Sequence, residues 1–211
     1  KMLMSENKHD AIGLLISGGV AIHFLPEATS TIRLKRLIWL ENSATKVGPL
    51  GKDPVRRLAS IVETDAVGAR KIAERLRLSN AQRDHLITLV DPPWQATSEI
   101  LGDDLRVLLY RLEPARIIDL CLLEWARVLT NTPVLPLEQS EAWLRIIDTA
   151  KAWVDLDFPL SGQDALDCGL AEGPRINEVL NQIEDWWTSG GCRADRDACL
   201  RKLRQAADDH F

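Results

Sequence analysis

Two short acidic patterns have the residue types of metal-dependent chemistry. Asp155 and Asp157 form an Asp-x-Asp pair, which can hold magnesium ions for phosphoryl transfer when both carboxylates converge on one site. His9 and Asp10 could ligate a metal ion if further His and Asp residues joined them. Neither pattern is accompanied by a glycine-rich phosphate loop or by further ligands at a metal-binding spacing. We therefore predict solvated hinge carboxylates, a surface histidine, no catalytic residue and no metal site.

A Gly-Pro-Arg sequence at 173–175 has the features of a phosphate-binding helix start. Proline lacks an N–H and suits the first helical position, and Gly173 has no side chain to block a ligand. The amides of Arg175 and Ile176 would point outward at the positive end of the helix dipole, beside the mobile cation of Arg175. Glu172 opposes an anion there, and such helix starts are more often structural. Both interpretations stay open at this point.

Basic residues also gather upstream, within eight positions: Arg70, Lys71, Arg75 and Arg77. Helical spacing puts Lys71 and Arg75 on one face, with the other two flanking it. Such a row can follow a phosphate backbone without reading bases. A solvated helix face is an equally good explanation of the same spacing.

The net charge of −5 conceals an uneven distribution. Residues 33–85 carry 12 Lys and Arg against 6 Asp and Glu, whereas residues 86–211 carry 12 against 22. A basic middle beside an acidic C-terminal half indicates a local anionic partner or, more simply, solvated helix faces. The acidic total argues against strong steering of the whole chain toward nucleic acid.

The elements that must position these residues all have helical signals. Alternating strand patterns are absent, and helix starts recur at Asp53-Pro54, Asp65, Ser79 with Gln82, Pro114 and Asp195. The apolar stretch that follows Pro114 predicts a central helix, and a later helix is predicted to include both Trp143 and Trp153. We predict an all-α fold, with a multi-helix body at 1–154 and a small helical tail subdomain at 155–211.

Composition restricts the class of protein further. Hydrophobic residues make up 45% and charged residues 27%, as in globular proteins, and no apolar run approaches the ~18 residues of a membrane helix. The stretch KMLMSENKHD has no apolar signal core and so does not argue for secretion, and the four scattered cysteines predict reduced thiols in or near a core. We expect a cytoplasmic protein with no membrane contact. At least five of the seven tryptophans are expected in the core.

One longer pattern joins two of these features. Leu160-Ser161-Gly162-Gln163-Asp164-Ala165 is followed by Gly169 and then by Gly173-Pro174-Arg175-Ile176-Asn177. This stretch resembles the tail of bacterial CCA-adding tRNA nucleotidyltransferases and their poly(A) polymerase relatives, particularly alphaproteobacterial members. Ala165 replaces a usual leucine and Asn177 a usual glycine. The resemblance extends upstream, mostly as helical pattern, over essentially the whole chain.

The resemblance implies a role in handling tRNA. The catalytic head, with its magnesium, would lie N-terminal to Lys1 in the same polypeptide, and position 1 is not an initiator methionine. The chain itself would be non-catalytic, would hold no cofactor, and would grip the tRNA acceptor–TΨC arm by its backbone while the head transfers CMP and AMP. The residues expected to bind RNA are Ser161, Gly162, Gly173 and Arg175 of the tail motif and Arg70, Lys71, Arg75 and Arg77 of the basic row.

Three alternatives stay open. The chain could be the same portion of a poly(A) polymerase, because the groups that select CTP or ATP would lie outside it. It could be a helical protein–protein interaction module whose basic row meets an acidic partner. It could also be a metal phosphohydrolase built on His9 and Asp10, which would contain bound metal.

Overall fold

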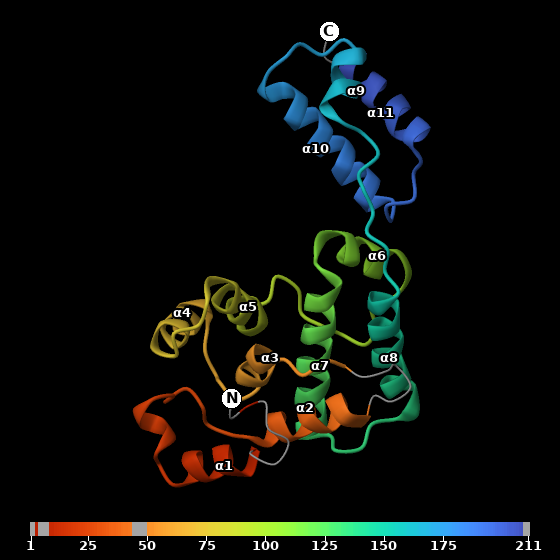
Figure 1. Ribbon diagram of the computed structural model, residues 1–211. Coiled ribbons are helices and arrows are strands. Elements are labelled where there is room, and N and C mark those ends of the chain that lie inside the picture. Colours follow the sequence, from red (N-terminus) through yellow and green to blue (C-terminus); the bar gives the residue numbers. More distant parts are fainter. Residues whose placement is uncertain (1–2, 4–8, 44–49, 209–211) are drawn as a thin grey trace. The chain divides into compact units, whose positions relative to one another are not determined.

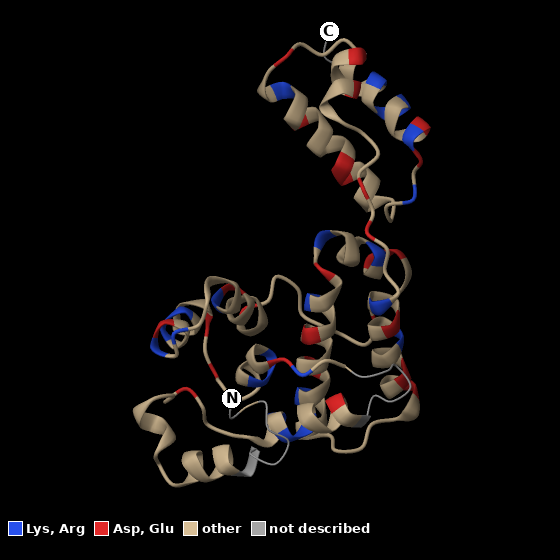
Figure 2. Cartoon of the chain, in the orientation of Figure 1, with Lys and Arg blue, Asp and Glu red and all other residues tan. Residues whose placement is uncertain are grey.

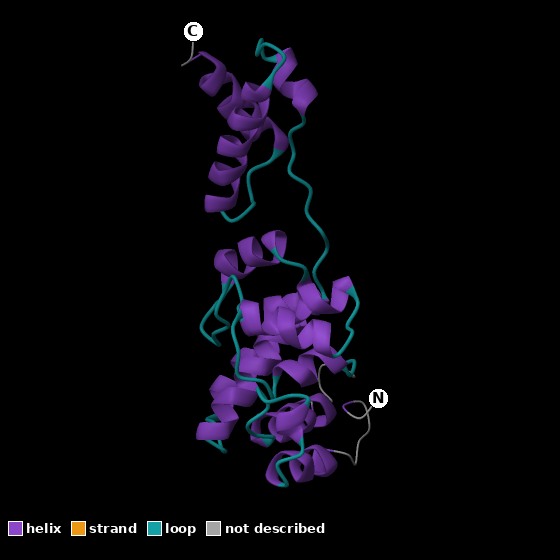
Figure 3. Ribbon diagram, turned by 90° about the vertical axis from the view of Figure 1, so that its left-hand side faces the viewer, coloured by secondary structure: helices purple, strands orange, loops and turns teal. Residues whose placement is uncertain are grey.

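The computed structural model describes residue 3, residues 9–43 and residues 50–208. These residues form helices and no strand (Figures 1 and 3), apart from one isolated antiparallel bridge between Ala28 and Val62. The all-α prediction is confirmed. The elements are α1 (His9–Ser17), the short 3₁₀ helix η2 (Ala21–His23), α2 (Ile32–Ser43), α3 (Pro54–Ala59), α4 (Ala66–Arg75), α5 (Asn80–Val90), α6 (Gly102–Arg111), α7 (Pro114–Asn131), α8 (Leu137–Lys151), α9 (Gly162–Asp167), α10 (Pro174–Ser189) and α11 (Arg196–Asp208).

The helices divide into two compact units. The first unit consists of residues 1–99 and 114–151, and the second unit of residues 100–113 and 152–211. Helix α6 therefore belongs with α9, α10 and α11, whereas the predicted body at 1–154 included it. The assignment of RNA-binding roles to a body and a tail stays a prediction.

In the first unit, α7 is the central helix. Ile117, Leu122 and Ala126 on α7 are fully buried, as the apolar composition of this stretch predicted. Helices α2 and α8 pack on α7, α3 packs on α5 and α7, and α4 packs on α5 (Figure 1). The rings of Trp125 on α7 and Trp143 on α8 stack with centroids 6.4 Å apart. Helix α7 is thus covered by α2, α3 and α8, whereas α4 packs on α5 and exposes its basic side chains.

The helix starts predicted from local sequence are found. The Asp53 carboxylate accepts a hydrogen bond from the Arg56 amide at 2.7 Å, and that of Asp65 accepts one from the Gly68 amide at 2.8 Å. Ser79 and Gln82 form the reciprocal capping box of α5. Each cap satisfies amides that would otherwise lack a partner in the first turn.

The second unit packs around Trp187 on α10. The rings of Tyr110 and Phe158 approach Trp187 edge-on, at 5.0 and 5.7 Å between centroids, and its indole N–H donates to the Ala194 carbonyl at 2.9 Å. Cys199 and Leu203 of α11 complete this core with no exposed surface. Because this core is small, each polar contact contributes a large share of the stability of the second unit.

Two predictions about tryptophans are wrong. Helix α8 ends at Lys151, and the Trp153 ring lies outside it, 5.7 Å beneath the Arg106 guanidinium. Only three tryptophans are buried, Trp125, Trp143 and Trp187, whereas Trp39 is 56% and Trp186 37% exposed. Trp39 misses the core because the buried side of α2 follows the spacing of Leu34, Leu37 and Leu40, and position 39 points away from it.

Two further findings concern thiols and membranes. All four cysteines are free, and three are buried, as predicted. Burial raises the pKa of the Cys121 thiol to about 12, so this thiol is a packing group rather than a nucleophile. Among the described residues, no helix has the length and apolar character needed to cross a lipid bilayer.

Candidate functional site

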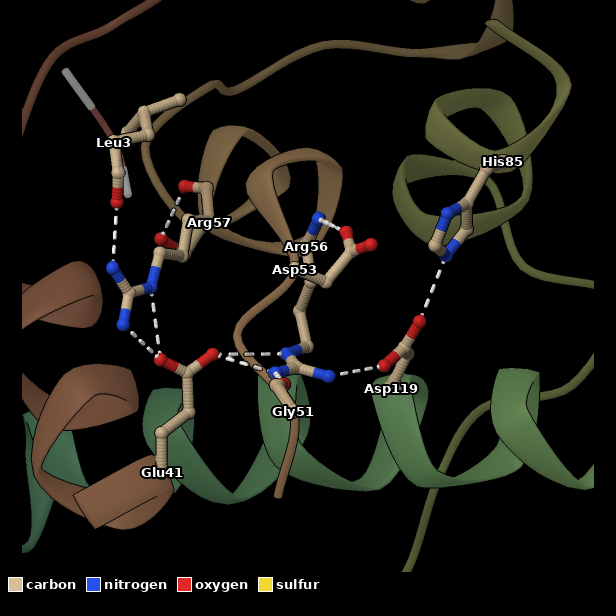
Figure 4. Close-up of polar contacts among 9 residues, drawn as sticks. Leu3, Glu41, Gly51, Asp53, Arg56, Arg57, His85 and Asp119 are labelled. Carbon is tan, nitrogen blue, oxygen red and sulfur yellow. Dashed lines mark hydrogen bonds and ion pairs between the residues drawn. The ribbon is translucent and has the colours of Figure 1, made fainter. Parts of the chain in front are cut away.

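A buried ionic cluster lies inside the first unit (Figure 4). Arg56 and Arg57 of α3 share the Glu41 carboxylate of α2: Arg56 Nη2 lies 2.6 Å from Oε1, and Arg57 Nη2 lies 2.5 Å from Oε2. Arg56 also reaches Asp119 of α7, with Nη1 2.5 Å from Oδ1. The other Asp119 oxygen lies 2.8 Å from Nε2 of His85 on α5. The cluster therefore joins α2, α3, α5 and α7.

The charges of this cluster are balanced and their hydrogen-bonding groups are used. Arg57 is fully buried, and Arg56, Glu41 and Asp119 are less than a tenth exposed. Arg57 donates also to the Leu3 carbonyl at 2.6 Å, and Arg56 to the Gly51 carbonyl at 2.5 Å. Burial lowers the pKa of Arg56, but the Asp119 and Glu41 carboxylates outweigh it and raise that pKa above its ordinary value. The cluster holds the fold, and among the described residues its two arginines and two carboxylates are already paired with one another.

Helix α4 presents basic side chains to solvent. Arg70, Lys71 and Arg77 are exposed, and none has an ion pair or side-chain hydrogen bond with another described residue. Figure 2 shows the basic positions of α4 in blue, and the sequence of this helix also includes the exposed Glu74. The opposite face of the helix is apolar and buried through Ala69, Ile72 and Ala73. Arg70 and Lys71 on α4 and Arg77 just after it are therefore three exposed cations without a partner in the part of the chain that the structure describes.

Arg75 has a different role from its neighbours. Its Nη1 lies 2.8 Å from Oε2 of Glu27, and its Nη2 lies 3.0 Å from Oε1 of the same carboxylate. The hydrogen bond from Arg75 lowers the pKa of Glu27. This bidentate pair connects the segment before α2 to α4. The positive charge of Arg75, which the sequence analysis counted in the basic row, is therefore neutralised by Glu27.

Arg77 occupies a backbone conformation that glycine usually takes. Its φ is +55°, and its amide and that of Leu78 bond back to Glu74 and Ala73, which closes the C-terminus of α4. A non-glycine residue in this region costs about 1 kcal/mol. At this position a glycine would give a more stable fold, yet the chain carries an exposed arginine.

In the second unit, the α9 part of the tail motif is joined to α11 by an ion pair and hydrogen bonds. The Ser161 amide donates to Oδ2 of Asp164 at 2.8 Å, and the Asp164 carboxylate also pairs with Arg196 of α11. Arg196 donates in addition to the Pro159 carbonyl. The hydrogen bond from Arg196, with those from Ser161, lowers the pKa of Asp164. Ser161 is exposed, but its hydroxyl already donates to Asp164 at 2.9 Å.

The two halves of the tail motif meet at the start of α10. A Cβ built on Gly162 would lie 3.9 Å from Cγ2 of Ile176, so the α9 start contacts the α10 start. Gly173 caps α10 with φ 148°, a value that residues with a side chain rarely adopt. The Ile176 amide, predicted to be free, donates to the Gly173 carbonyl at 3.2 Å. Arg175 is exposed and has no partner among the described residues.

The structure therefore brings the predicted residues together in two groups. Ser161, Gly162, Gly173 and Arg175 lie around the α9 and α10 starts, and Arg70, Lys71, Arg75 and Arg77 lie on and just after α4. Asp155 and Asp157 are exposed, and the described residues contain no set of three His, Cys, Asp or Glu that could hold a metal ion. The side chains of His9 and Asp10 lie outside the described residues.

Comparison with known proteins supports part of the resemblance. Over 77 residues, 36% of this chain, the sequence is 27% identical to the CCA tRNA nucleotidyltransferase 1, mitochondrial, of Danio rerio. Over 69 residues, 33% of the chain, it is 39% identical to an uncharacterized 28 kDa protein of the petA 5′ region of Rhodospirillum rubrum. The matched parts span 18% and 27% of these relatives' own lengths. No protein-family model matches the chain.

Sequence reasoning missed the residues whose importance depends on burial. In the sequence, Arg56 and Arg57 were counted only as part of a basic region. Two adjacent arginines within the mostly apolar stretch 55–62 could have indicated a buried ion cluster. Arg196 was missed because its partner Asp164 lies 32 residues away. Only the folded arrangement separates cations that hold the structure from cations that are free.

Proposed function

We propose that this chain is a tRNA-binding portion of a nucleotidyltransferase of the CCA-adding type. The observation that carries the proposal is the similarity to the mitochondrial CCA tRNA nucleotidyltransferase of Danio rerio. The uncompensated cations Arg70, Lys71 and Arg77 support it, because phosphate contacts supply most of the affinity in binding that ignores sequence. The transfer of nucleotides to the tRNA 3′ end is assigned to a magnesium-dependent head in the same polypeptide, as the resemblance implies.

In this proposal the two groups of residues have different tasks. The exposed ends of the α4 cations can follow phosphates of an A-form stem, which is recognised by shape and backbone. At the α10 start, Arg175 and the open approach at Gly173 suit one further phosphate. Such contacts accept any tRNA, because they carry no base information.

The binding test removes charge without disturbing the core. The affinity of the chain for tRNA is measured by fluorescence anisotropy at about 50 mM and about 200 mM salt. The Arg70→Gln/Lys71→Gln variant is compared with Arg36→Gln/Arg145→Gln, which makes the same change of charge elsewhere in the first unit. We expect the first variant to bind at least about tenfold more weakly, with a shallower dependence on salt, and the control to bind as the wild type does. Equal affinity of both variants would contradict the assignment of α4.

The catalytic part of the proposal is tested on the full-length polypeptide. Incubation with tRNA lacking its 3′ end, magnesium and labelled CTP or ATP should add CMP and then AMP. Addition of AMP alone would instead identify a poly(A) polymerase. No addition of either nucleotide, with tRNA bound, would overturn the enzyme assignment and leave an RNA-binding protein.

A further inference from the structure

A cavity of about 420 Å³ opens into the first unit, away from every residue assigned to RNA. It lies between α2, α5, α7 and the segments that follow α3 and α5. Its size is within the range of small-molecule sites in proteins, which runs from about 300 to 1,000 Å³. Its polar lining consists of Arg33, Glu63, Thr64, Gln95, Glu124 and Arg127.

Arg33 is the unusual group in this cavity. Its Nε donates to the Leu123 carbonyl of α7 at 3.1 Å, which fixes the orientation of the guanidinium. Its two terminal nitrogens have no hydrogen-bond or ion-pair partner among the described residues. Burial lowers the pKa of Arg33, and the nearby charge of Arg127 lowers it further, against the effect of Glu124. The terminal nitrogens of this half-buried guanidinium are thus available to an acceptor that enters the cavity.

The carboxylate that could have compensated Arg33 is already engaged. Both oxygens of Glu124 accept from Arg127, at 2.7 and 2.6 Å. Arg33, Glu124 and Arg127 together carry a net charge of +1 at the cavity wall. Glu63, the other acid in the lining, is exposed. With Glu63 the lining as a whole is neutral, so the attraction for an anion comes from the unpaired terminal nitrogens of Arg33 and not from the net charge of the cavity.

The rest of the wall selects for an apolar portion. Val62, Leu89 and Leu120 belong to this wall and are almost fully buried, and Pro92 and Ala96 add further carbon surface. A site with one convergent cation and an apolar wall is typical of pockets for small organic ligands. It offers no aromatic platform on which a nucleic-acid base would stack.

We propose that this cavity is a binding site for a small organic anion, whose phosphate or carboxylate group is held by the terminal nitrogens of Arg33 and whose apolar portion lies against Val62, Leu89 and Leu120. The site is separate from the α4 cations, so it binds its ligand whether or not tRNA is present. It adds a small-molecule function to the proposed RNA-binding function and does not depend on it.

The test uses the whole chain and three probes. Inorganic phosphate, adenosine 5′-monophosphate and hexanoate are titrated by isothermal calorimetry, so that oxyanion type and apolar portion are varied separately. We expect at least one of the two organic anions to bind at least about tenfold more tightly than inorganic phosphate, because only they use the apolar wall. A dissociation constant weaker than about 10 mM for all three would overturn the proposal.

Variants locate the binding. Arg33→Gln should weaken binding of the tighter organic probe at least about tenfold, whereas Arg145→Gln on α8 should leave it unchanged. Ala96→Trp adds bulk to the cavity wall while keeping Arg33, and should weaken binding as well, so it serves as the test if Arg33→Gln fails to fold. Binding that survives in a folded Ala96→Trp protein, or that is lost in Arg70→Gln/Lys71→Gln, would place the anion elsewhere and overturn the site. Neither result would bear on tRNA binding by α4.

Discussion

Helices α3 and α4 each carry two adjacent basic residues, and the fold uses the two pairs in opposite ways. Arg56 and Arg57 of α3 are buried and share the Glu41 carboxylate, with Asp119 as a further partner of Arg56. Arg70 and Lys71 of α4 are exposed and have no partner among the described residues. The two pairs contribute equally to the basic character of residues 33–85. Local charge in the sequence is thus a poor measure of charge that a ligand can reach.

The difference follows from where each helix packs. Helix α3 is short and lies against both α5 and α7, so its charged side chains have no route to solvent and must find partners inside. Helix α4 contacts α5 with one face only, and its charged residues lie on the other. The same residue types therefore stabilise the fold in α3 and stay available for an anion in α4.

The largest effect is expected from removing the shared acid of the buried cluster. Glu41→Gln leaves two buried guanidinium groups with one carboxylate, which should lower the free energy of unfolding by about 3–5 kcal/mol. The measurement is urea unfolding followed by circular dichroism. Glu74→Gln on the exposed side of α4 is the control and should change stability by less than about 0.5 kcal/mol. If the two changes lowered the free energy of unfolding by similar amounts, the buried charges around α3 would matter no more for stability than the exposed charges of α4, which would contradict the comparison.

The next largest effect extends the comparison to the tail motif. Gly173→Ala forces a side chain into φ 148° and should destabilise the second unit by about 2 kcal/mol. Gly162→Ala places its Cβ at an ordinary contact distance of 3.9 Å from Ile176 and should be nearly neutral. Thermal unfolding of both variants measures this. A loss of tRNA affinity in the folded Gly162→Ala protein would identify an RNA contact, and a stability loss there would indicate packing only.

A smaller effect is expected at the Asp164–Arg196 pair, because Arg196 is half exposed. Asp164→Asn should cost about 1–2 kcal/mol at neutral pH, from the pair and the Ser161 cap together. The pKa of Asp164 is depressed in the folded state, so this contribution is present above its ordinary value of 3.8 and is lost as the pH falls through the folded-state pKa. The urea midpoints of wild type and variant should therefore move closer together when the pH is lowered from neutral to well below 3.8. A constant difference at both pH values would rule out the carboxylate as the cause.

The smallest effect has the opposite sign. Arg77→Gly relieves a positive φ of 55° and should stabilise the first unit by about 0.5–1 kcal/mol. The same change removes one of the free cations of the α4 region, so tRNA affinity should fall severalfold. Thermal unfolding and anisotropy are measured on the same preparation. A variant that is more stable and binds tRNA equally well would confirm the backbone strain and show that Arg77 does not contact tRNA.

The sequence could predict what depends on neighbours along the chain. Asp53, Asp65 and Ser79 were identified as caps because capping needs only residues two or three positions away. The apolar stretch after Pro114 identified the central helix for the same reason. The exposure of Trp39 and the pairing of Arg75 with Glu27 could not be predicted, because each is decided by a segment distant in sequence.

The candidate site shows the same limit. The sequence predicted a helix start at Gly173-Pro174 and a helix that carries the basic row, and both helices are found; the similarity to a tRNA enzyme covers 36% of the chain. It could not predict that Arg75 is neutralised, that the Ile176 amide is used within α10, or that Arg33 faces a cavity. Each of these is set by contacts between helices.

The central claim is that the exposed cations of α4 meet tRNA and the buried ones of α3 do not. Its most direct test is the rate at which an amine-reactive reagent modifies Lys71, followed by mass spectrometry with and without saturating tRNA, with Lys151 of α8 as the internal reference. The account predicts that tRNA slows modification of Lys71 at least about fivefold relative to Lys151, because an ammonium held against phosphate is withdrawn from the reagent. An unchanged Lys71 rate in the presence of bound tRNA would contradict it.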